Sequence, residues 1–129
     1  MSFKLSERSK VNMAGVDPRL IKIAEMAIEI TRIDFGIPSD GGLRTPERQN
    51  ELFKAGKSKL DGTRQKSEHQ KGLALDFYAY VDGKASWEKE HLAQVAAAFL
   101  QSASILGYKL NWGGLWKSFL DMPHVQLMD

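Results

Sequence analysis

The stretch LALDFYAYV at residues 73–81 carries the clearest strand pattern of the chain. Its apolar residues at positions 73, 75, 77 and 79 alternate with small, acidic or aromatic residues, as expected of a strand that buries one face. An Asp-Gly pair at residues 82–83 follows, and such pairs form turns. We therefore predict one strand over residues 73–81.

Three helices are predicted around this strand. Asp17-Pro18 and Thr45-Pro46 each join a capping residue to a proline at the first helical position. The glycine and proline at positions 36 and 38 should close the first helix, and the second should end near position 56. Ser86 is expected to cap the third helix, which Gly107 ends. The expected buried stripes of the first and third helices are Leu20, Ile23, Ala24, Ala27 and Ile30, and Leu92, Val95, Ala96, Phe99, Ala103 and Leu106.

Two further short strands are predicted at residues 108–112 and 124–128, with a Gly-Gly turn between them. The polar segment 57–71 is predicted to be a loop, and its length suggests a functional role. Helices around a few antiparallel strands give an α+β fold, a small antiparallel sheet flanked by helices. A length of 129 residues fits a single domain, so we expect one domain over residues 1–129.

Composition excludes several classes of function. The net charge is only +2, with 18 basic residues scattered among 16 acidic ones, so no nucleic-acid partner is expected. The absence of cysteine excludes disulfides and thiolate metal sites. Charged residues interrupt every long apolar segment, so no membrane insertion is expected. Residues 1–10 are polar and do not resemble a signal peptide, which predicts a protein that starts in the cytoplasm of the cell that makes it.

Two of the three histidines stand out as candidate metal ligands. His69 ends the polar loop, Asp76 follows it by seven residues within the predicted strand, and His124 begins the last strand. An unpaired carboxylate among the apolar neighbours of Asp76 would cost several kcal/mol of desolvation, which a divalent cation removes. Two imidazoles and one carboxylate suit zinc, and three protein ligands leave a fourth position for water, as in catalytic sites. His91 lies on the polar side of the third helix and is given no role.

The spacing of these residues does not by itself distinguish two interpretations. They could bind a metal ion, or they could be capped-loop residues and an ion-paired surface aspartate. Five aromatic residues leave a similar choice between a sugar-stacking platform and ordinary packing, and packing is favoured, with only Trp112 expected to help wall a site. The five are Tyr78, Tyr80, Trp87, Trp112 and Trp116.

A family resemblance favours the metal site. SEHQKGLALD at residues 67–76 is similar to the Ser-x-His-x-x-Gly-x-Ala-x-Asp motif of the D-Ala-D-Ala carboxypeptidase and dipeptidase superfamily. Asp121-x-x-His124 resembles its second motif, GLRT at 42–45 its upstream arginine segment, and WGG at 112–114 the turn before the second motif. The whole, over about residues 36–128, looks like the L-alanyl-D-glutamate endopeptidase branch, the compact endolysins of tailed bacteriophages.

The resemblance implies a Hedgehog/DD-peptidase-like fold and a role for each matching residue. His69, Asp76 and His124 would bind Zn²⁺. Asp121 would be the general base, and Arg44 would contact the substrate or the developing oxyanion. Ser67 would hydrogen-bond beside the site and contribute to substrate binding. Leu115 occupies a position where several relatives carry an acidic residue, which puts local substrate contacts in doubt but leaves the metal ligands intact.

The expected function is therefore zinc-dependent cleavage of the L-Ala–D-Glu bond in the peptidoglycan stem peptide, as a phage lysis protein. Release of terminal D-Ala or D-Ala-D-Ala uses the same metal residues and stays open, as does a non-catalytic, zinc-stabilised binding module. No separate cell-wall-binding domain fits in the chain. The resemblance implies a monomer in the host cytoplasm that depends on a holin to reach the periplasmic wall.

Overall fold

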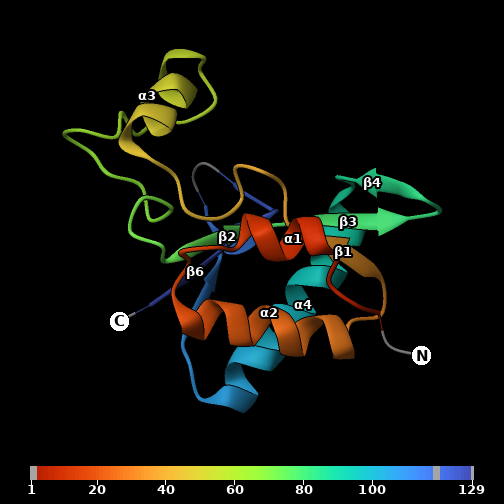
Figure 1. Cartoon of the computed structure of the whole chain (residues 1–129). Coiled ribbons are helices and arrows are strands. Elements are labelled where there is room, and N and C mark those ends of the chain that lie inside the picture. Colours follow the sequence, from red (N-terminus) through yellow and green to blue (C-terminus); the bar gives the residue numbers. More distant parts are fainter. Residues whose placement is uncertain (1–2, 118–119, 129) are drawn as a thin grey trace.

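The computed structural model describes residues 3–117 and 120–128, which form short strands surrounded by helices (Figure 1). This arrangement confirms the predicted α+β class. The helices are α1 (Glu7–Asn12), α2 (Pro18–Ile30), α3 (Pro46–Lys54), α4 (Lys89–Leu106) and the 3₁₀ helix η1 (Gly113–Leu115). The strands are β1 (Asp34–Gly36), β2 (Ala74–Asp76), β3 (Tyr78–Val81), β4 (Lys84–Ser86), β5 (Leu110–Trp112) and β6 (His124–Leu127).

The strands form two antiparallel sheets rather than one. Their orders are β1-β3-β4 and β2-β6-β5. The prediction of one strand over residues 73–81 is wrong, because Phe77 separates β2 from β3 and each belongs to a different sheet. The Phe77 backbone N–H donates to the Pro123 carbonyl at 2.8 Å, outside either ladder, while its fully buried ring stacks on Phe99.

The two proline-started helices begin where the sequence predicts. The Asp17 carboxylate accepts a hydrogen bond from the Arg19 backbone N–H, and the Thr45 hydroxyl accepts one from that of Arg48. The first helix ends at Ile30, before the predicted closing residues, and Gly36 lies in β1 rather than at the end of the helix. Ile30 is 39 % exposed, because the helix instead turns the neighbouring Ile28 into the core.

The prediction that Ser86 caps the third helix is also wrong. Asp82 and Gly83 both have positive φ, 53° and 76°, and form the two-residue turn of a β3–β4 hairpin that includes Ser86. The N-cap position of α4 is Glu88, whose side chain makes no capping hydrogen bond. The Ser86 hydroxyl lies 2.7 Å from His91 Nδ1, so His91 belongs to this junction.

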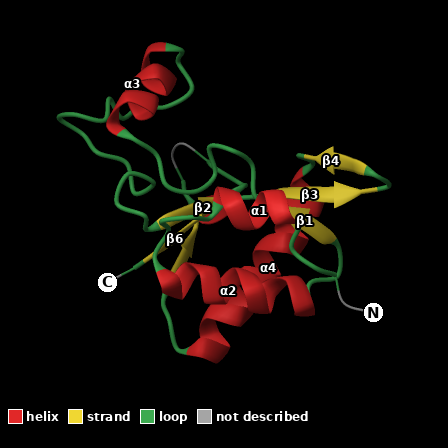
Figure 2. Ribbon diagram, viewed as in Figure 1, coloured by secondary structure: helices red, strands yellow, loops and turns green. Residues whose placement is uncertain are grey.

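The core lies where α2 and α4 pack together against the sheets. The helix α3 and the loop after it lie on the opposite side of the strands from α2 and α4 (Figures 1 and 2). Among the described residues, no helix is long and apolar enough to cross a membrane. The loop after α3 and the neighbouring strands β2 and β6 line a common cavity.

Candidate metal centre and its cavity

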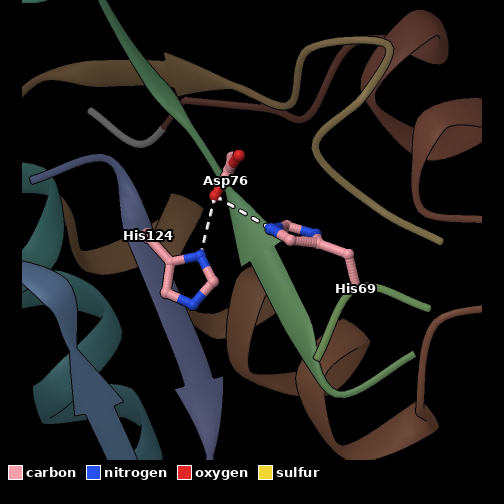
Figure 3. A group of neighbouring side chains, drawn as sticks. All are labelled: His69, Asp76 and His124. Carbon is pink, nitrogen blue, oxygen red and sulfur yellow. Dashed lines mark hydrogen bonds and ion pairs between the residues drawn. The ribbon is translucent and has the colours of Figure 1, made fainter. Parts of the chain in front are cut away.

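Three predicted ligands converge at the end of the β2-β6-β5 sheet. Asp76 pairs with His124 across β2 and β6, and both imidazoles point toward the Asp76 carboxylate (Figure 3). His69 Nε2 lies 3.2 Å and His124 Nδ1 lies 3.0 Å from Asp76 Oδ1. The ligand atoms of the three residues all lie within 4.8 Å of one another. Two imidazole nitrogens and one carboxylate oxygen at this spacing can hold a metal ion.

The loop that carries His69 is fixed by its backbone. Gly72 has a φ of 74°, and its N–H donates to the His69 carbonyl at 3.2 Å, which closes the turn between the histidine and β2. The Gly72 carbonyl accepts from the Asp17 N–H at 2.9 Å, which ties the turn to the start of α2. His69 Nδ1 faces the Gly42 carbonyl at 3.0 Å, so the Nδ1–H donates there and Nε2 is left for a metal ion.

Asp76 is the electrostatic centre of the group. Burial would raise the pKa of its carboxyl group, but hydrogen bonds from His124 and His69 outweigh burial and hold that pKa well below its usual range. Burial would likewise lower the pKa of His124, yet the hydrogen bond to Asp76 raises it. The carboxylate is therefore ionised at neutral pH and attracts cations.

Asp121 lies beside these ligands. Its Oδ2 is 3.8 Å from His124 Nδ1, too far for a hydrogen bond. Burial, followed by repulsion from the Asp76 carboxylate, raises the pKa of Asp121. The Asp121 N–H donates to the Gly113 carbonyl at 3.0 Å, and a Cβ at Gly113 would come too close to the Asp121 backbone. The Gly-Gly turn thus positions an acidic group next to the candidate metal site.

Arg44 binds Asp76 from the side away from the histidines. Its Nη2 donates to Asp76 Oδ2 at 3.1 Å, its Nη1 to Gln49 Oε1 at 3.2 Å and its Nε to the Asp40 carbonyl at 2.9 Å. The side chain is mostly buried. In the structure, Arg44 therefore neutralises and orients the carboxylate, although it also reaches the cavity wall.

The residues surround a cavity of about 390 Å³. A larger cavity of about 510 Å³, between the end of α2 and α4, has no His, Asp or Glu among its lining residues, so we assign the chemistry to the smaller one. The smaller cavity is lined by Arg44, Lys57, Ser58, Lys59, Leu60, Ser67, Glu68, His69, Asp76, Trp116, Asp121, His124 and Gln126.

The model of the phage L-alanyl-D-glutamate peptidase family matches residues 1–128. The chain belongs to this family. It is 37% identical to the L-alanyl-D-glutamate peptidase of Escherichia phage T5 over 119 residues. This matched region covers 92% of this chain and 85% of the phage T5 protein. The predicted resemblance is thereby confirmed.

Two further relatives of the peptidase family agree. The peptidoglycan L-alanyl-D-glutamate endopeptidase CwlK of Bacillus subtilis is 32% identical over 98 residues, which cover 67% of this chain and 58% of that protein. The crystal structure of the Serratia marcescens L-Ala D-Glu endopeptidase ChiX is similar with a TM-score of 0.86 and 35% identity. That likeness covers 99% of this chain and 90% of the ChiX chain, and it supports the fold.

Ser67 lies at the cavity wall of this family member but has a local partner. Its side chain is buried, and its hydroxyl accepts a hydrogen bond from the Gln70 N–H at 3.3 Å. The Gln70 side chain in turn accepts from the Ser67 N–H and donates to the Gly62 carbonyl. The structure thus places Ser67 in the turn that carries His69, and Ser67 is one of the residues that line the cavity.

The aromatic residue at the cavity is Trp116 rather than Trp112. The Trp116 ring packs against the His124 ring with centroids 5.2 Å apart, and its Nε1–H donates to Asn111 Oδ1 at 3.2 Å. Trp112 instead donates to the Met122 carbonyl and packs against the core, so the expectation for it is wrong. The two tryptophans are four residues apart in the sequence, and the tertiary structure distinguishes their roles.

Two glutamines near the site escaped the sequence analysis. Gln49 is fully buried, and its side-chain amide bonds Arg44, the Ser58 hydroxyl and the Leu60 carbonyl. Gln126 bonds His124. Gln126 stands two residues after a candidate ligand in a predicted strand, and this spacing places it on the same face as His124. That pattern could have identified it.

Proposed function

We propose that the chain is a zinc-dependent endopeptidase that hydrolyses the bond between L-Ala and D-Glu in the peptidoglycan stem peptide. The observation that carries this proposal is the convergence of His69, Asp76 and His124 at a cavity that also contains Asp121. The names of the phage T5, CwlK and ChiX relatives support the choice of scissile bond.

The zinc ligands in this proposal are His69 through Nε2, His124 through Nδ1 and Asp76 through its carboxylate. The nitrogen and oxygen donors match what zinc prefers, and the absence of cysteine leaves no softer competitor. When bound, zinc supplies Lewis-acid chemistry, because it polarises a carbonyl group and makes a water molecule more acidic.

Asp121 is proposed as the general base. It takes a proton from the attacking water and delivers it to the leaving amide nitrogen, so no net proton is consumed in the transfer. Its raised pKa, caused by burial and by Asp76, makes it a better proton acceptor than an ordinary aspartate. Its distance of 3.8 Å from His124 Nδ1 leaves it outside the proposed ligand set but beside it.

Arg44 and Ser67 are proposed to act on the substrate side of the cavity. The permanently charged guanidinium of Arg44 faces the place where negative charge develops on the scissile carbonyl or where a substrate carboxylate lies. Its three hydrogen bonds to Asp40, Gln49 and Asp76 fix its direction. Ser67 offers a hydroxyl at the wall for a hydrogen bond to the peptide.

We further propose a role in host lysis. The protein would accumulate as a monomer in the host cytoplasm and reach the periplasmic wall once a holin permeabilises the membrane. The names of the phage relatives support lysis as the setting. Lysis timing in a host that expresses the protein with and without a holin tests this dependence.

Mass spectrometry of digested muropeptides tests the reaction itself. The expected products are stem peptides with a new D-Glu N-terminus and glycan strands that keep L-Ala. Loss of terminal D-Ala alone would refute the proposed bond and assign a carboxypeptidase. No release of peptide by zinc-loaded protein would indicate a binding module, so a chelated sample and a zinc-restored sample are run together.

A further inference from the structure

His124 is held at both of its ring nitrogens. Nδ1 faces the Asp76 carboxylate at 3.0 Å, while Nε2 lies 2.8 Å from Oε1 of Gln126. An amide oxygen only accepts hydrogen bonds, so a proton at Nε2 donates to Gln126. If a metal ion took the place of the Nδ1 proton that faces Asp76, the remaining proton would stay at Nε2 on Gln126, and the Nδ1 lone pair of the neutral imidazole would be available to the ion.

The strand geometry keeps Gln126 in this position. His124 and Gln126 are two residues apart on β6, so their side chains project from the same face. On the β2 side, Gln126 pairs with Ala74, which has a small side chain. On the β5 side it pairs with Asn111, which bonds the Trp116 ring that packs on His124.

The two histidines therefore face Asp76 and the proposed metal site with different ring nitrogens, Nε2 in His69 and Nδ1 in His124. In each histidine, the ring nitrogen that points away from the site faces a hydrogen-bond acceptor. For His69 the acceptor is the Gly42 carbonyl, a backbone group that no side-chain substitution removes. For His124 it is the Gln126 side chain. Orientation of the second imidazole thus depends on one replaceable residue.

We propose that Gln126 is a positioning residue that fixes the tautomer and ring orientation of His124 and thereby sets the affinity of the site for zinc. This inference rests on the proposed zinc site. Acceptors on the far nitrogen of a metal-binding histidine orient the ring and increase its basicity, and their loss typically weakens metal binding about 10- to 100-fold.

Zinc titration against a competing chromophoric chelator, at fixed pH, tests the inference without reference to activity. Gln126→Leu removes the acceptor and keeps a similar volume, and it should weaken zinc binding about 10- to 100-fold. Gln126→Glu keeps an acceptor and should bind zinc at least as tightly as the wild type. Gln101→Leu, at an exposed position of α4 that lines the other cavity, is the matched control and should leave zinc affinity unchanged.

Wild-type zinc affinity in Gln126→Leu would overturn the inference, as would an equal loss in Gln126→Glu. Nitrogen-15 NMR of the zinc-loaded wild type gives a reading that does not depend on a variant folding. The proton should lie on Nε2 of His124, and a proton on Nδ1 would overturn the proposal. Wild-type protein that binds zinc but leaves peptidoglycan intact would refute the proposed function alone.

Discussion

Replacement of Gln49 by leucine should disconnect Arg44 from the wall of the cavity. The Gln49 Nε2 group donates to the Ser58 hydroxyl and to the Leu60 carbonyl, each at 2.8 Å, and its Oε1 accepts from Arg44 at 3.2 Å. The side chain is 0% exposed, so water cannot replace these bonds without a structural change. Leucine has a similar volume, and the substitution therefore removes hydrogen bonds without opening a large cavity.

The magnitude follows from these three bonds. The two neutral bonds contribute about 1 kcal/mol each, and the bond from the charged Arg44 about 1.5–3 kcal/mol. Burial of leucine in place of the amide returns about 1.5 kcal/mol. The free energy of unfolding should therefore fall by about 2–3.5 kcal/mol, which for a domain of this size lowers Tm by about 10 °C. Misplacement of Arg44 and of residues 57–60 should also reduce kcat/KM about ten- to hundred-fold.

Urea unfolding and muropeptide kinetics, both well below the Tm of the variant, measure the two effects. Asn50→Leu is the matched control, because Asn50 is the next residue on α3 and its side chain donates a hydrogen bond to the same loop, 2.9 Å to the Asp61 carbonyl. It should cost about 1 kcal/mol or less and leave kcat/KM near that of the wild type. The reasoning fails if Gln49→Leu is no more destabilising than Asn50→Leu, or if its kinetics are unchanged.

Three further perturbations test the site and its surroundings. Asp121→Asn should keep zinc at wild-type stoichiometry but lose about 10²–10⁴-fold in kcat, and a variant at the wild-type rate would remove Asp121 from the mechanism. His69→Ala should lose both zinc and activity, and full zinc occupancy in this variant, measured by metal analysis, would contradict the proposed ligand set. In the wild type, a chelator should abolish activity and added zinc should restore it. The ion pair with Arg48 lowers the pKa of Asp40 below its unfolded value of about 3.9, so its stabilising effect is present above that pH and disappears as pH falls through the folded pKa. Asp40→Asn should therefore flatten the dependence of the urea midpoint on pH below about pH 4, and an unchanged slope would show that the pair contributes nothing to acid stability.

The sequence was most informative where local chemistry determines structure. Asp17 and Thr45 cap helices because side-chain oxygens accept from nearby N–H groups, an interaction confined to a few residues. The short strands β1 and β4 have no such local cause. Both are three-residue strands defined by their pairing with β3, and the Asp-Gly pair predicts the end of a strand without indicating that a second strand follows.

The site shows the same division. The spacing from His69 to Asp76 indicated that one turn could bring them together, and Gly72 makes that turn. The role of Arg44 in binding Asp76, by contrast, joins residues 32 positions apart, and no sequence period predicts such a pair. The packing of the Trp116 ring, rather than the Trp112 ring, against His124 is likewise a tertiary contact that the sequence pattern does not predict.

Register links the fold of this domain to its site. Leu75 pairs with Val125, and both side chains are fully buried, so the core admits only one alignment of β2 with β6. The same alignment sets Asp76 opposite His124. A slip of β2 by one residue would turn Leu75 out of the core and would also separate the Asp76 carboxylate from the His124 imidazole. Packing between two short strands therefore preorganises the candidate metal site, and the hydrogen bonds at the far nitrogens of the two histidines have only the remaining ring rotation to restrict.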